Sequence, residues 1–223
     1  TISISYARNY QQSEAFRVKH AETRPVAVPA VAFANAEPLS EIGIVAVVSG
    51  DGLQRVFESL GVNAVVPGGQ TMNPSTQDLL QAIDSIPNEQ VILLPNNSNI
   101  VLAAQQARDL AEKQVELVPT KTIPQGIAAL LAFNYQSDLD VNVGAMISAS
   151  EQVETIEITQ AVRSAQVNGL TIAEGQYLGL LDGDLVTVGE TVKAVTESLM
   201  EQVDMTACEI VTIYHGRDVL PQE

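Results

Sequence analysis

Four short apolar runs, separated by helix-like segments, constrain this chain more than any other feature of its sequence. The runs span residues 44–48, 62–66, 90–94 and 115–118, and each is followed by an amphipathic stretch of helical length. Strands that alternate with helices predict βαβ units and a parallel sheet. Hydrophobic residues make up 46% of the chain and aromatic residues only 4%, so small aliphatic side chains have to build the core. We therefore predict a parallel α/β lobe over residues 42–138.

The pattern changes after residue 138. A helix is predicted over residues 141–153, followed by short alternating strands with tight turns at Asn168-Gly169 and Asp182-Gly183. A further helix over residues 191–203 and a strand over residues 209–214 complete this part. We predict a second, smaller α+β lobe over residues 139–223, with antiparallel strands. The last strand is the exception, because there we expect the parallel rhythm to resume.

The first 41 residues differ from both lobes. Residues 1–6 alternate between apolar and polar side chains, which is typical of an edge strand. Residues 25–41 are rich in Ala and Pro, which indicates a linker. We interpret residues 1–41 as a linker or as the remnant of an upstream middle domain.

The charge and the scarcity of metal-binding side chains argue against several classes of function. The chain has 27 acidic and 11 basic residues, a net charge of -16, and no cluster of Lys and Arg. Nucleic acids and anionic membrane surfaces attract basic clusters, so neither partner is predicted, and no apolar run is long enough to span a bilayer. With one Cys and two His, no metal site is predicted. The lone Cys208 also fits a reducing, cytoplasmic location.

Polar loops follow three of the four predicted strands, at residues 68–75, 94–99 and 119–126. In an open parallel sheet such loops gather at the carboxyl edge, where ligands and partners bind. Ordinary helix starts explain part of them, with Asn73 as an N-cap before Pro74, and with Asn99 and Pro124 opening later helices. The candidate binding residues are Gly68, Gly69, Gln70, Thr71, Asn73, Asn96, Asn97, Thr120, Lys121, Thr122 and Gln125.

The chemistry of these loops favours an anion or a protein partner. Gly68 and Gly69 permit close approach of a backbone or ligand, and free N–H groups at a helix start attract a phosphate or carboxylate. Lys121 is the only lysine in the three loops, and it can neutralise a phosphate or pair with a carboxylate of a partner. A self-sufficient enzyme has little support, with Asp51 and Lys121 as its best acid–base candidates. No catalytic residue is assigned.

The three loops together resemble a known family. They read Gly-Gly-Gln-Thr-Met-Asn-Pro-Ser at 68–75, Leu-Pro-Asn-Asn at 94–97 and Pro-Thr-Lys-Thr-Ile-Pro-Gln-Gly at 119–126. This set is similar to the carboxy-terminal domain of the dihydroxyacetone-kinase-like subunit of bacterial fatty-acid kinase. Ala-Val-Arg at 161–163 and the Gly-x-Tyr-x-Gly pattern at 175–179 fit as well. The resemblance runs from about residue 42 to residue 218.

The resemblance implies a DegV-like, dihydroxyacetone-kinase-like architecture and a role in fatty-acid phosphorylation. A separate DegV-like protein would carry the fatty acid, and its carboxylate would be phosphorylated to an acyl phosphate. ATP and Mg²⁺ would bind an amino-terminal domain that this chain lacks, so no cofactor is expected here. The chain would dock the acyl carrier and be inactive alone, and a homodimer through the full-length protein is compatible with this. The alternative is a phosphate- or small-molecule-binding domain of a dihydroxyacetone-kinase-like protein.

The chain also departs from the family pattern. The family continues past the Gly-x-Asp at 216–218 with a helix, a strand and a second Gly-Gly-Gln-Pro motif, whereas this chain ends at Glu223. We therefore expect the second lobe to be incomplete at its carboxyl end.

Overall fold

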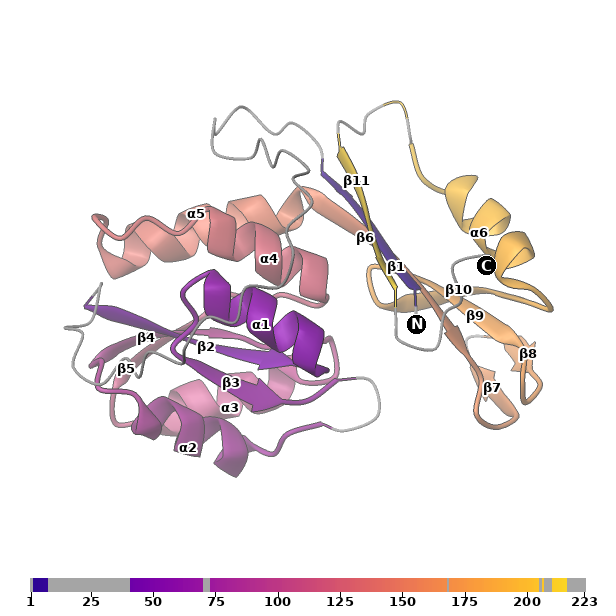
Figure 1. Ribbon diagram of the computed structural model, residues 1–223. Helices are drawn as coiled ribbons and strands as arrows, with labels where there is room; N and C mark the ends of the chain where they lie inside the picture. Colours follow the sequence, from indigo (N-terminus) through magenta and orange to yellow (C-terminus); the bar gives the residue numbers. More distant parts are fainter. Residues whose placement is uncertain are drawn as a thin grey trace, which may run out of the picture.

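The fold comprises a parallel α/β lobe and an antiparallel lobe (Figure 1). The computed structural model describes residues 2–7, 41–69, 73–167, 169–204, 206 and 210–215. Residues 8–40, which include most of the predicted linker, lie outside the described residues, as do Gln70, Thr71, Cys208 and residues 216–223. The mixed α/β class predicted from the sequence is confirmed.

The first lobe contains a four-stranded parallel sheet in the order β3-β2-β4-β5. Its strands are β2 (Ile42–Val48), β3 (Ala64–Pro67), β4 (Gln90–Leu94) and β5 (Gln114–Leu117). The helices that follow them are α1 (Asp51–Ser59), α2 (Thr76–Ser85), α3 (Val101–Leu110), α4 (Ile123–Leu131) and α5 (Leu139–Glu151). Because helices cover both faces, β2 is apolar on both sides and buried throughout.

Two apolar cores lie on opposite faces of this sheet. Ile44 and Ile92 point to the face where α1, α4 and α5 contribute Phe57, Ala129 and Met146. Val45, Val91 and Leu93 point to the other face, where α2 and α3 contribute side chains including Leu79 and Ala104. Figure 1 shows the same division, with α4 and α5 on one side of the sheet and α2 on the other.

The second lobe is built on a five-stranded antiparallel sheet in the order β10-β9-β6-β1-β11. The strands are β1 (Ile2–Ala7), β6 (Val153–Gln160), β9 (Tyr177–Leu181), β10 (Asp184–Gly189) and β11 (Ile210–His215). A hairpin of β7 (Ala165–Val167) and β8 (Leu170–Ile172) extends from it. Helix α6 (Val192–Met200) packs Val195 and Leu199 against Ile156 and Ile158 of β6.

Both predicted hairpin turns of the second lobe are confirmed. Val167 pairs with Leu170, and Leu181 pairs with Asp184, so each turn has two central residues. Asp182 and Gly183 have φ of 51° and 87°, the left-handed conformation that such turns require.

Two predictions about strand partners are wrong. The amino-terminal strand is not an edge strand, because β1 pairs with β6 on one side and β11 on the other. The last strand does not resume the parallel rhythm, because β11 runs antiparallel to β1. Local alternation identified both strands, but the partner of a strand depends on segments far away in the chain. Residues 2–7 therefore belong to the sheet of the second lobe.

Helix α2 begins two residues later than predicted. Its N-cap is Ser75 rather than Asn73, because Ser75 and Asp78 form a reciprocal capping box. The Ser75 side chain accepts from the Asp78 N–H (3.2 Å), and the Asp78 carboxylate accepts from the Ser75 N–H (2.8 Å) and hydroxyl (2.7 Å). These bonds hold the pKa of Asp78 below its usual value, with the Ser75 hydroxyl as the largest cause.

Lys113 caps the carboxyl end of α2, and we expect its replacement to lower the stability of the fold measurably. Its ammonium donates to the carbonyls of Ile83 (2.9 Å) and Ile86 (2.6 Å). Cations that bind the last carbonyls of a helix stabilise it. We expect Lys113→Met to lower the free energy of unfolding by about 1–2 kcal/mol in urea denaturation. Lys193→Met is the control, because Lys193 is exposed and makes only a 3.8 Å pair with Glu197. Equal stability of the two variants would contradict this role.

None of the helices in the described ranges has the length and apolar character that a bilayer crossing requires.

Candidate functional site

The candidate site lies at the carboxyl edge of the parallel sheet. All four strands run in the same direction, so the loops after β2, β3, β4 and β5 meet at one edge. In the order β3-β2-β4-β5, β2 and β4 are the central neighbours. The chain continues from β2 outward to β3 at one edge and from β4 outward to β5 at the other edge. Such a reversal is where open α/β sheets bind ligands. The three loops predicted from the sequence do gather here.

Asn96 cross-links the ends of three strands at this reversal. Its side chain is 5% exposed and donates from Nδ2 to the carbonyl of Val47 (3.0 Å). Its Oδ1 accepts from the Thr120 hydroxyl (2.7 Å), and its backbone N–H donates to the same hydroxyl oxygen (3.1 Å). Asn96 has φ 52°, which asparagine tolerates better than most residues. Asn96 and Thr120 therefore hold the edge together, and neither is free to contact a partner.

Gly126 in the first turn of α4 presses against this amide. A Cβ at this position would lie 2.7 Å from the Asn96 Cγ and even closer to Oδ1. The glycine therefore lets α4 pack directly on the Asn96 side chain, which explains the Gly in the Pro-Gln-Gly sequence.

Three more of the predicted binding residues support local structure. Asn97 is 5% exposed, and its Oδ1 accepts from the Asn99 N–H (2.9 Å) just before α3. Thr122 is the N-cap of α4, where its hydroxyl accepts from the Gln125 N–H (3.4 Å). The side-chain Oε1 of Gln125 accepts in turn from the Lys121 N–H (2.8 Å). Turn and cap chemistry uses the same types of side chain as ligand recognition, and it accounts for the bonds of these three residues.

The glycines of the first loop also have packing roles. A Cβ on Gly68 would lie 2.6 Å from Cδ of Pro74 and 2.7 Å from Cγ1 of Val47, and a Cβ on Gly69 would lie 2.9 Å from Cβ of Ser49. Gly68 is buried, whereas Asn73 is exposed. The two glycines bring the loop after β3 against the loop after β2.

The exposed part of the edge differs from the predicted set and shares Gly69, Asn73 and Lys121 with it. We define the carboxyl-edge surface by residues that are exposed or half-buried and come from all four loops. They are Ser49, Gly50, Asp51, Gly69, Asn73, Ser98, Asn99 and Lys121. Helix α1 begins on this surface after Gly50, which has φ 86° and no side-chain cap.

The second lobe reaches the same edge, which the sequence did not indicate. The Asp182 N–H donates to the Thr155 carbonyl (2.8 Å), and the Asp182 carboxylate accepts from the Thr155 N–H (2.9 Å). The hydroxyls of Thr155 and Thr122 are 2.8 Å apart and form a buried hydrogen bond between the lobes. The next residue, Gly183, lies against Ser98, whose Oγ would be 3.5 Å from a Cβ at Gly183. The turn between β9 and β10 is thus part of the edge.

The carboxyl group of Asp182 in this turn has a higher pKa than that of an exposed aspartate. Burial raises the pKa of Asp182, and the nearby Asp184 raises it further. The Thr155 N–H and the charge of Lys121 lower it, but not enough to cancel the effect of burial.

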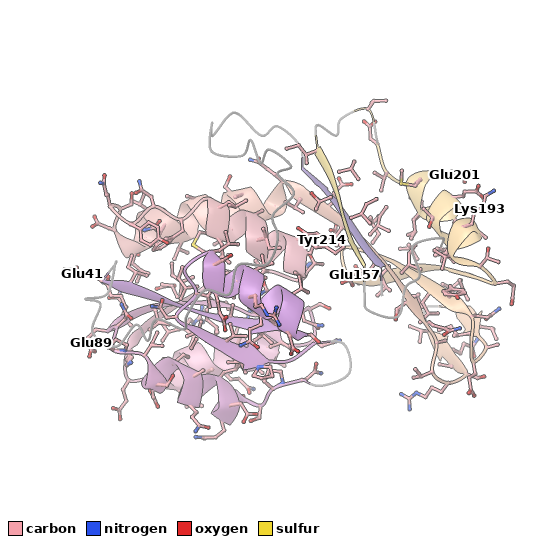
Figure 2. The ribbon with its side chains drawn as sticks, in the orientation of Figure 1. Glu41, Glu89, Glu157, Lys193, Glu201 and Tyr214 are labelled. Carbon is pink, nitrogen blue, oxygen red and sulfur yellow. The ribbon has the colours of Figure 1, made fainter. Side chains whose placement is uncertain are left out.

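Two grooves in the described parts lie largely outside the carboxyl-edge surface. One, of about 540 Å³, runs between the outer side of β3 and α2 and shares only Asn73 with the carboxyl-edge surface. Its one ionisable side chain, Asp78, is engaged in the capping box. The other lies near Glu41 and Glu89, which Figure 2 places at the far end of the parallel lobe from β6. Among the described residues, no group of three His, Cys, Asp or Glu side chains could hold a metal ion.

The described parts define a mixed α/β protein whose candidate site is an exposed, polar surface of the parallel lobe, with the turn between β9 and β10 of the second lobe packed beside it. The chain belongs to the family of FakA-like C-terminal domains of fatty acid kinase, whose model matches residues 43–223. This match confirms the resemblance drawn from the three loops.

Similarity to individual proteins agrees with the family. The chain is 40% identical over 181 residues to Protein YloV of Bacillus subtilis (strain 168), which covers 81% of this chain and 33% of that protein. It is 36% identical over 185 residues to an uncharacterized protein of Staphylococcus epidermidis (strain ATCC 12228 / FDA PCI 1200), covering 83% and 34% respectively. An uncharacterized protein of Staphylococcus aureus (strain USA300) is 34% identical over 179 residues, covering 80% and 32%. The chain therefore spans about a third of the length of these relatives.

Proposed function

We propose that this chain serves as the docking domain within a fatty-acid kinase, and that its carboxyl-edge surface receives a DegV-like acyl-carrier protein. The fatty acid bound to that carrier is then phosphorylated on its carboxylate, with ATP and Mg²⁺ held by a domain outside this chain. Family membership supports the kinase context. The observation that carries the docking role is the exposed, polar carboxyl-edge surface with Lys121 on it.

The shape and charge of this surface favour a macromolecular partner. Enclosed pockets suit small ligands, whereas the residues of the carboxyl-edge surface are exposed or half-buried and are spread over four loops. A lysine at such a surface attracts a carboxylate of the partner at short range. We infer that docking, rather than catalysis, is the role of this chain.

A charge reversal at Lys121 tests this role. We expect Lys121→Glu to weaken binding of the acyl-loaded DegV-like protein by about tenfold, as an attractive contact becomes repulsive. The dissociation constant is measured by calorimetry with the carrier loaded with palmitate. Lys193→Glu is the matched control, because it changes the charge equally on α6, which Figure 2 shows on the outer side of the second lobe.

A second variant tests the surface sterically. Ser98→Arg places a bulky side chain on the carboxyl-edge surface, and we expect it to weaken binding at least as much. Asn97→Ala is unsuitable, because it removes the bond that orders the start of α3. If both Lys121→Glu and Ser98→Arg keep the wild-type affinity, the docking proposal is wrong. Binding of inorganic phosphate or acetyl phosphate at this surface, without carrier binding, would support the small-molecule alternative instead.

A further inference from the structure

The turn between β9 and β10 is tied to the carboxyl edge by Thr155. The Thr155 carbonyl accepts from the Asp182 N–H (2.8 Å), and the Thr155 N–H donates to the Asp182 carboxylate (2.9 Å). The Thr155 hydroxyl is in turn 2.8 Å from the hydroxyl of Thr122, the N-cap of α4. The next residue of the turn, Gly183, lies against Ser98 of the carboxyl-edge surface. Thr155 is therefore bonded both to the turn and to the parallel lobe.

The hydrogen bond between Thr155 and Thr122 is suited to fixing an orientation rather than to adding stability. Both side chains are buried, with exposed fractions of 0% and 1% respectively. Two apolar side chains of the same shape would be about as stable, whereas two hydroxyls bond only at a defined distance and angle. The bond also lies close to the crossing between the lobes, because Gln152 alone separates α5 from β6. It therefore helps to set how the second lobe lies on the parallel lobe.

We propose that Thr155 positions the turn between β9 and β10 as a second part of the docking site, so that the partner binds across both lobes. The inference rests on the docking function proposed above and extends its surface to Gly183 and Asp184. Both residues are accessible, because Gly183 is half-buried and Asp184 is exposed. A partner seated on Ser98 meets the turn as well, since Gly183 lies against Ser98. Thr155 itself is buried and acts only through the residues that it holds.

Removal of the Thr155 hydroxyl is the direct test. Thr155→Val keeps the shape of the side chain but breaks the bond to Thr122, and we expect the affinity for the palmitate-loaded carrier to fall about threefold to tenfold. Thr155→Ser keeps the hydroxyl and loses only a buried methyl group, so its affinity should stay within about twofold of wild type. Thr159→Val is the control, because it makes the same change at a half-buried position further along β6. Equal losses of affinity in the valine and serine variants of Thr155 would overturn its positioning role.

A distance measurement reports the orientation of the lobes directly. Spin labels are attached to cysteines at Gln105 in α3 and Glu174 before β9, both of them exposed, after the native Cys208 has been replaced by serine. We expect electron paramagnetic resonance to give a broader distribution of distances for Thr155→Val than for Thr155→Ser. Identical distributions in the two variants would contradict the proposal, because a loss of stability alone does not change the orientation of folded molecules.

A substitution in the turn itself tests whether the partner contacts it. We expect Asp184→Arg to weaken binding by about fivefold or more, because a long side chain at this position obstructs a partner that spans both lobes. Glu174→Arg is the matched control, because it makes the same change of charge at an exposed position beyond the opposite end of β9. Equal affinities of these two variants would overturn the proposal. Asp184 is exposed, so this test does not depend on how the buried site of Thr155 tolerates replacement.

The outcomes separate this inference from the docking function on which it rests. Wild-type affinity of Thr155→Val and Asp184→Arg, together with weaker binding by Lys121→Glu, would overturn the two-lobe site and leave docking at the carboxyl-edge surface intact. Wild-type affinity of all three variants would overturn the docking function and this inference with it.

Discussion

Replacing Asn96 with alanine is expected to lower the free energy of unfolding by about 3–4 kcal/mol, the largest loss foreseen for a single polar side chain here. The change removes two side-chain hydrogen bonds, to the Val47 carbonyl and from the Thr120 hydroxyl, and leaves both partners buried without them. It also places alanine at φ 52°, where asparagine is better tolerated. The three strand ends that meet at Asn96 then lose their common anchor.

Urea denaturation followed by circular dichroism measures this loss. Asn99→Ala is the matched control, because Asn99 is an exposed asparagine of the same loop. We expect that control to stay within about 0.5 kcal/mol of wild type. If Asn96→Ala is no less stable than Asn99→Ala, the anchoring role of the amide is refuted.

Adding a methyl group at Gly126 is expected to cost about 2–3 kcal/mol, although alanine is the better helix former. The new Cβ would overlap the Asn96 amide, which cannot turn away without breaking its bonds to Val47 and Thr120. Gly144→Ala provides the contrast within the same lobe. Gly144 lies in α5, and apart from the backbone of its own helix nothing lies within 4 Å of the added Cβ, so that change should stabilise the protein by about 0.5–1 kcal/mol.

The two substitutions should also be coupled. In an Asn96→Ala background the obstacle to the new methyl group is gone, so Gly126→Ala should cost much less than it does in the wild type. Additive losses in the double variant would show that the two sites act independently, contrary to the packing of α4 on the Asn96 amide.

The pattern along the chain predicted the elements well, but the roles of particular side chains less well. The runs at 44–48 and 90–94 are strands because both of their faces are apolar, and Asn-Gly and Asp-Gly are turns because their backbone conformation favours these residues. The start of α2 was misplaced because Asn73-Pro74 and Ser75 with Asp78 are both plausible local caps. In the structure Ser75 and Asp78 form the cap through reciprocal hydrogen bonds. Residue spacing alone does not show which of two possible caps is the more stable.

For the candidate site, too, the location could be predicted from the sequence, but the roles of several side chains could not. Its location at the carboxyl edge is a consequence of parallel strands, and its exposed lysine could be read from the sequence. Asn96, Asn97, Thr120 and Thr122 looked like recognition residues, but they form the internal bonds of the edge. Amide and hydroxyl groups serve both ligand recognition and internal hydrogen bonding, and only their hydrogen-bond partners in the structure show which role a residue has.

Taken alone, the sequence determined the parallel lobe, the antiparallel turns and the family, because these depend on the period of apolar residues and on loop motifs within short segments. Tertiary structure alone decided that β1 lies inside the second sheet, that Asn96 is an anchor, and that Thr155 of the second lobe bonds to Thr122 at the edge. These contacts join residues that lie tens of positions or more apart, and long-range contacts form only when the whole chain packs to bury its apolar faces.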